Sequence, residues 1–113
     1  MSKKKKLPAH TKGSGNIFAD LGLPNAEEHQ LKAVLVVQLK QLIAERGLSQ
    51  VATAKLVAMK QPDLSKLLRG QLKPVSVEKL LRMLTAFDQD VEITVKRHRK
   101  RGETGRITFV PAP

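Results

Sequence analysis

Apolar residues recur at three- and four-residue intervals between residues 26 and 46, the spacing that places side chains on one face of a helix. Gly47 follows the run as a helix C-cap would, and Glu27 and Glu28 fall in the first turn, where the helix dipole favours negative charge. The pattern therefore predicts one long helix over residues 26–46. Its apolar face comprises Leu31, Leu35, Leu39, Leu42 and Ile43.

Three shorter helices are predicted further along the chain, so the fold class is expected to be mainly α. Ser49 is a suitable N-cap for a helix over residues 50–57. After a short interruption, a third helix is predicted to begin at Gln61 and to end at Gly70. Ser76 is a suitable N-cap for a fourth helix. The apolar face of this fourth helix comprises Leu80, Leu81, Leu84 and Phe87.

After Asp90 the period of the apolar pattern changes from helical to alternating. Val91, Ile93 and Val95 alternate with polar residues, which predicts a β-strand, and residues 107–110 could form a second one. A lone hairpin is marginally stable in water. We therefore expect the strand either to pair with a second copy of the chain, giving a homodimer, or to fold back on its own helices.

The charge of the chain points to a polyanion as partner. The net charge is +11, but residues 1–16 hold five Lys and no acid, and residues 96–106 hold six Lys or Arg against one Glu. Residues 17–95 are then nearly neutral. This layout favours a body that positions and reads nucleic acid while two basic segments supply electrostatic attraction. A solvated tail that only aids solubility is the alternative for the N-terminal run.

The chain is expected to form one domain with two flanking segments. Residues 1–16 are predicted to be a disordered basic arm, residues 17–87 the folded domain, and residues 88–113 a strand or hairpin with a basic loop that serves dimerisation. A short apolar lead-in is expected to pack against the body. It comprises Ile17, Phe18, Leu21 and Leu23.

The second and third helices are joined by so short a turn that they predict a helix-turn-helix. The third helix has an apolar side, with Leu64 and Leu67, and a polar side, with Lys66 and Arg69. In a helix-turn-helix such a second helix enters the major groove of DNA. An ordinary helical hairpin within a bundle is the alternative.

The stretch LSQVATAKLVAMKQPDLSKLLRG, residues 48–70, resembles the helix-turn-helix of the Cro and cI repressor (Xre) family. It matches without gaps that family's pattern of Leu, Ser or Thr, Gln, a buried Ala, a short turn, Gln and a closing Arg-Gly. The flanks, GNIFADLGLPNAEE and VSVEKLLRMLTAFDQDVEITVK, resemble small Xre regulators grouped with HigA-type antitoxins. The resemblance implies a Cro/cI-type domain of four to five helices with a short C-terminal β-strand or hairpin.

Position by position, the resemblance implies which residues contact DNA. Gln50 falls where the family contacts a phosphate, and Gln61, Pro62 and Lys66 fall where recognition helices reach base edges. Glutamine can pair with adenine, lysine can donate to guanine, and a proline ring can touch a thymine methyl group. Further phosphate or flanking contacts are expected from Lys60, Ser65, Arg69 and Lys73.

Two positions depart from the family pattern. Ala58 occupies the turn where the family often has Gly, so the backbone there must either tolerate a side chain or avoid a positive φ. Lys60 replaces the usual Ser or Thr cap of the recognition helix, which is expected to cost about 1 kcal/mol unless Asp63 compensates. Lys60 could gain a phosphate contact instead.

Other chemistry finds little support in the sequence. Without Cys there is no disulfide or thiolate metal site, and His10, His29 and His98 lack the spacing of metal ligands. No cofactor motif, catalytic constellation or membrane span is present, so an enzyme is not expected. With no Trp or Tyr, the stacking platforms that bind single strands are missing, which favours duplex DNA.

These observations favour a cytoplasmic, nucleoid-associated, dimeric regulator that binds duplex DNA in a sequence-specific way. Its recognition helix is expected at about residues 61–69 and its dimer interface at Val91, Ile93 and Val95. It would act as a repressor of its own promoter. One alternative adds neutralisation of a ribonuclease toxin of the RelE or HigB kind, as the resemblance implies. Another is a basic protein associated with RNA or the ribosome.

Overall fold

Helices account for all of the regular structure in residues 25–112, the part of the chain that the computed structural model describes. They are α2 (Asn25–Arg46), α3 (Gln50–Leu56), α4 (Gln61–Leu68) and α5 (Val77–Ala86). The four helices predicted from the apolar pattern are thus confirmed, with ends shifted by a residue or two. The expected N-terminal arm and its apolar lead-in lie outside the described residues.

Local chemistry explains where the helices begin and end. The Ser49 hydroxyl accepts a hydrogen bond from the Ala52 N–H at 3.0 Å, and the Ser76 hydroxyl accepts one from the Lys79 N–H at 3.0 Å. Each bond satisfies an amide that has no partner within its own helix. Gly47 follows α2 with a φ of 62°, a conformation that side-chain-bearing residues rarely adopt. The predicted caps and the glycine stop are therefore confirmed.

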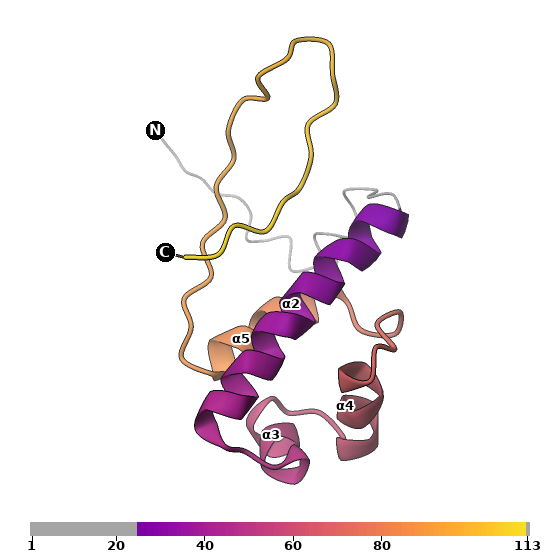
Figure 1. Ribbon diagram of the computed structural model, residues 1–113, viewed down its shortest axis with the longest axis vertical. Helices are drawn as coiled ribbons and strands as arrows, with labels where there is room; N and C mark the ends of the chain where they lie inside the picture. Colours follow the sequence, from indigo (N-terminus) through magenta and orange to yellow (C-terminus); the bar gives the residue numbers. More distant parts are fainter. Residues whose placement is uncertain (1–24, 113) are drawn as a thin grey trace, which may run out of the picture.

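The core lies between α2 and α5, and α4 packs against α2 beside it. Figure 1 shows α2 running past α5, with α3 and α4 together at one end of the body. Of the predicted apolar face of α2, Leu35 and Leu39 are buried and the other three side chains are partly buried. Because the core includes the apolar side of α4, the polar side of that helix is left facing outward. The most deeply buried side chains are Leu35, Leu39, Thr53, Leu64, Leu67, Leu80, Met83 and Phe87.

An arginine ties the end of α2 to the end of α5. The Arg46 guanidinium donates to the Phe87 carbonyl oxygen at 2.9 Å and to the Asp88 carboxylate at 3.0 Å. Its central carbon also lies 5.1 Å from the centre of the Phe87 ring, within cation–π range. These contacts join residues about forty positions apart and hold the start of the C-terminal segment beside α2.

The predicted C-terminal strand or hairpin does not form within the described chain. Residues 88–112 contain no strand, and no backbone hydrogen bond joins residues 91–96 to residues 107–110. Figure 1 shows this segment leaving α5, extending away from the body and returning, and Phe109 on the return packs partly against the core. The alternating pattern supplies two faces, but a strand also needs a partner edge, which this single chain does not provide.

The Thr53 hydroxyl is buried without a hydrogen-bond partner among the described residues. Leaving such a group unpaired costs free energy, so Thr53→Val, which keeps the shape and removes the hydroxyl, should raise the free energy of unfolding by about 1 kcal/mol in urea denaturation. Thr85→Val is the matched control, since the Thr85 hydroxyl is exposed and donates to the Arg82 carbonyl at 2.6 Å. A lower stability for Thr53→Val would mean that the hydroxyl has a partner in solution.

Candidate nucleic-acid interface

The turn between α3 and α4 sets the angle of the two helices. Ala58 adopts a φ of 56°, so the backbone tolerates a side chain in the left-handed conformation at the position that departs from the family pattern. The Met59 N–H donates to the Ala54 carbonyl at 2.9 Å and closes the end of α3. Ala54 is buried, which lets α3 lie close against the rest of the unit.

Gln50 and Gln61 are held together at the start of the two helices. The Gln61 side-chain amide donates to the Gln50 side-chain oxygen at 3.0 Å, and both residues are exposed. The side-chain oxygen of Gln61 and the second N–H of its amide stay available. Together they form the acceptor and donor pair that matches the edge of an adenine. The Gln50 amide group also keeps its N–H donors, which suit a phosphate oxygen.

The polar side of α4 carries most of the other predicted contacts. Pro62 lies in the first turn, and Pro62, Lys66 and Arg69 are exposed. The Arg69 guanidinium donates to the Ser65 hydroxyl at 2.6 Å, so these two side chains are already paired. Lys60 caps α4 with its backbone only and makes no side-chain capping bond, as expected from its residue type. Its ammonium group is therefore not used by the helix.

Lys32, which was not among the site residues predicted from the sequence, supports the segment that follows α4. Its side chain is 6% exposed, and its ammonium group donates to the backbone carbonyls of Leu72 at 3.3 Å and Lys73 at 3.4 Å. Glu28, one turn earlier, balances the charge at 3.1 Å. The position of Lys32 did contain a clue, because it shares the apolar side of α2 with Val36 and Leu39. A buried lysine there holds the backbone that carries the predicted contact Lys73.

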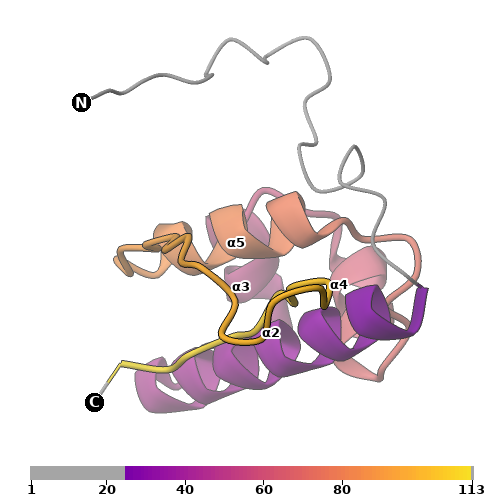
Figure 2. The same cartoon turned by 90° about the horizontal axis from the view of Figure 1, so that it is seen from above.

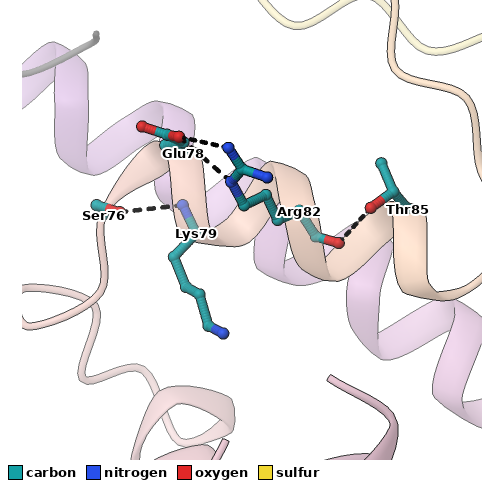
Figure 3. Close-up of polar contacts among 5 residues, drawn as sticks. All are labelled: Ser76, Glu78, Lys79, Arg82 and Thr85. Carbon is teal, nitrogen blue, oxygen red and sulfur yellow. Dashed lines mark hydrogen bonds and ion pairs between the residues drawn. The ribbon is translucent and has the colours of Figure 1, made fainter. Parts of the chain in front are cut away.

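Lys79 supports the turn from the other side. Its ammonium group donates to the Val57 carbonyl at 3.2 Å, at the C-terminus of α3, where the helix dipole favours positive charge. Figure 3 shows the Lys79 side chain pointing away from the Glu78–Arg82 ion pair, which joins successive turns along α5 at 3.0 Å. Lys79 was also missed, since nothing local to its position in α5 indicates a contact with residue 57.

The predicted interface residues do not all lie together. Gln50, Lys60, Gln61, Pro62, Ser65, Lys66, Arg69 and Lys73 belong to α3, to α4 or to the segments directly beside α4. Val91, Ile93 and Val95 lie in the C-terminal segment and are 37%, 67% and 91% exposed. The structure thus gathers the predicted nucleic-acid contacts at one end and separates them from the predicted dimerisation residues.

Two other kinds of feature are absent from the described part of the chain. Within residues 25–112, no three His, Asp or Glu side chains are grouped closely enough to hold a metal ion. None of the helices in that part of the chain has the length and apolar character needed to cross a membrane.

Comparison with known proteins agrees with this geometry. A family model described as a helix-turn-helix domain matches residues 17–96. A solved structure named as an XRE family transcriptional regulator is similar, with 39% identity and a TM-score of 0.73; the match covers 79% of this chain and 100% of that one. A search of curated proteins gives no match. The chain therefore belongs to the helix-turn-helix proteins of the XRE family of transcriptional regulators.

Proposed function

We propose that the protein is a transcriptional regulator that binds duplex DNA in a sequence-specific way and has no enzymatic activity. The observation that carries this proposal is the hydrogen bond between Gln50 and Gln61. It joins the first residues of α3 and α4 and leaves both side-chain amides exposed to solvent. In a helix-turn-helix the N-terminal residues of the second helix contact base edges. Here those residues are Gln61 and Pro62, with Lys66 one turn later.

The contacts divide into two kinds by chemistry. Gln61 and Lys66 carry groups that discriminate bases, and Pro62 can touch a thymine methyl group. Gln50, Lys60 and Arg69 carry donors suited to phosphate oxygens, which fix the register of the protein but not the sequence. Ser65 supports Arg69, and Lys73 extends the phosphate contacts beyond α4. A regulator with these contacts would be cytoplasmic and associated with the nucleoid.

We propose further that the protein acts as a homodimeric repressor of its own promoter. Val91, Ile93 and Val95 are exposed apolar side chains on a segment whose backbone has no partner within the described chain. Pairing with a second copy would cover both the side chains and the open edge. The resulting two-fold symmetry could place two recognition helices about 34 Å apart, one turn of DNA.

A toxin-neutralising function is a second candidate, favoured by one surface. A narrow exposed stripe of α2 is uncharged over four turns, with the exposed Lys40 and Glu45 at its edges, and Val37 on it is 51% exposed. Such a surface suits a protein partner, and the flanking segments resemble those of antitoxins that bind a ribonuclease. Copurification of a co-expressed RelE-like toxin with the wild type, and its loss with Val37→Glu, would support this function. The surface comprises Gln30, Val34, Val37, Gln41 and Ala44.

Selection from random duplex DNA tests the main proposal. We expect enrichment of a palindrome whose half-sites are about 10 base pairs apart, because a symmetric dimer reads two consecutive turns of one face. The selected duplex should then compete better than structured RNA for the protein. Failure to enrich any sequence, or stronger competition by the RNA, would reject the proposal in favour of an RNA-associated protein.

A further inference from the structure

The C-terminal basic loop, residues 96–106, lies at the opposite end of the body from the candidate interface. Figure 1 shows the tip of the loop at one end of the longest dimension, which is 46 Å for the described residues, and α3 and α4 at the other end. In Figure 2, seen from above, the loop lies in front of the helical body and α3 and α4 lie behind it. The loop and α4 therefore face in different directions.

The positive charge of the basic loop is exposed and not neutralised by neighbours. Its six Lys and Arg side chains are all exposed, and none of them takes part in an ion pair among the described residues. The single acid of the loop, Glu103, lies 3.2 Å from the ring of His98 and is occupied there. The loop thus presents five net positive charges on one short stretch of chain.

The composition of the basic loop identifies the class of its partner. None of its eleven residues is aliphatic or aromatic apart from the His98 ring. Protein interfaces need an apolar or aromatic centre, and single-stranded nucleic acids need aromatic stacking, so neither class fits. The phosphate backbone of a duplex needs only closely spaced cations. The chemistry of the loop therefore matches the phosphate backbone of a duplex bound without regard to sequence, and for a protein of this family that duplex is DNA.

We propose that the C-terminal basic loop is a second DNA-binding site that holds another duplex, or a distant segment of the same one, while α4 holds the operator. The loop points away from α4, so DNA seated on α4 lies at the other end of the molecule. The two-duplex complex rests on the function proposed above for α4, whereas binding of DNA by the loop does not. Such a protein would bridge two DNA segments, one chosen by sequence and one by charge alone.

Capture of a second duplex by the operator-bound full-length protein tests this proposal. The operator duplex obtained by selection is immobilised, and a labelled duplex of unrelated sequence is added. The loop variant Arg97→Gln/Arg99→Gln/Lys100→Gln/Arg101→Gln removes four charges. The matched control removes four lysines from the N-terminal run, as Lys3→Gln/Lys4→Gln/Lys5→Gln/Lys6→Gln. Thermal unfolding of both variants should match that of the wild type, because the substituted loop residues are exposed.

The loop variant should capture the second duplex on the order of 100-fold more weakly and bind the operator within about threefold of the wild type. Capture by the wild type should fall about 500-fold between 50 and 200 mM salt, as expected for about five phosphate contacts. The lysine control should retain capture.

Four results would overturn the proposal. Equal loss of operator affinity and capture in the loop variant would place the loop on the operator itself. Loss of capture only in the lysine control would make the N-terminal run the second site. Displacement of the labelled duplex preferentially by structured RNA or by anionic lipid vesicles would assign another partner class. Capture that is absent in the wild type would remove the second site altogether. Absence of operator binding alone, with charge-dependent duplex binding by the loop retained, would instead reject the function proposed for α4.

Discussion

Ile93→Glu should convert the protein from a dimer to a monomer and weaken its binding to the selected palindrome by about 100-fold or more. Ile93 is 67% exposed in the single chain, so a carboxylate there should leave the fold of the monomer unchanged. In a dimer interface the same carboxylate would be removed from water without a partner, which is costly. Once the dimer is lost, the second half-site no longer gains from the millimolar effective concentration that linkage provides.

Sedimentation equilibrium and binding to a palindrome and to an isolated half-site measure this effect. Affinity for the isolated half-site should not change, since the C-terminal segment that carries Ile93 extends away from α3 and α4 (Figure 1). Two matched controls place the same charge on exposed valines elsewhere. They are Val110→Glu on the returning part of the C-terminal segment, where Val110 is 80% exposed, and Val37→Glu on α2, where Val37 is 51% exposed. If Val37→Glu dissociates the dimer and Ile93→Glu does not, the interface is the outer side of α2.

Gln61→Ala and Lys66→Ala should each cost about 1 to 3 kcal/mol on the preferred site and relax the choice of base at one position. Both side chains project from the polar side of α4 while Leu64 and Leu67 hold the other side in the core. Removing Gln61 also frees Gln50 from its hydrogen bond, so the loss for Gln61→Ala should lie toward the upper end of this range. A double-mutant cycle with Gln50→Ala measures this coupling.

Binding measured across a set of single-base variants of the site distinguishes base contacts from phosphate contacts. Lys60→Ala is the control, because a phosphate contact should weaken binding to all sequences alike and reduce the slope of log K against log salt by about one. Uniform weakening by Lys66→Ala would reassign Lys66 to the phosphate backbone. If Gln61→Ala keeps the affinity and selectivity of the wild type, then Gln50 and Gln61 do not take part in DNA recognition.

The sequence alone predicted the helices and their boundaries because the responsible signals are local. The serine caps act on amides three residues away, and the apolar periods of α2 and α5 are visible within a few turns. The same locality explains why the strand predicted after Asp90 is not seen in the single chain. An alternating pattern shows which faces a strand would have, but whether it forms depends on a partner edge that lies elsewhere or on another chain.

The family resemblance identified the two departures in the turn, while the outcome at each needed the structure. Lys60 leaves α4 without a side-chain cap, as its chemistry requires. At Ala58 the sequence allowed either a strained or an ordinary backbone, and the fold adopts the positive φ. The backbone strain at Ala58 persists because the packing of α3 and α4 around it determines the path of the turn.

What the sequence determined by itself was the set of helices, the family-like turn and the chemical types of the contacts, since these depend on residues close together in the chain. Only the tertiary structure decided that Gln50 meets Gln61, that Lys32 and Lys79 support the backbone around α4, and that the basic loop points away from that helix. The side-chain contacts among these features join residues that are 11 to 41 positions apart. The packing of α2, α4 and α5 sets such distances, and no local pattern encodes them.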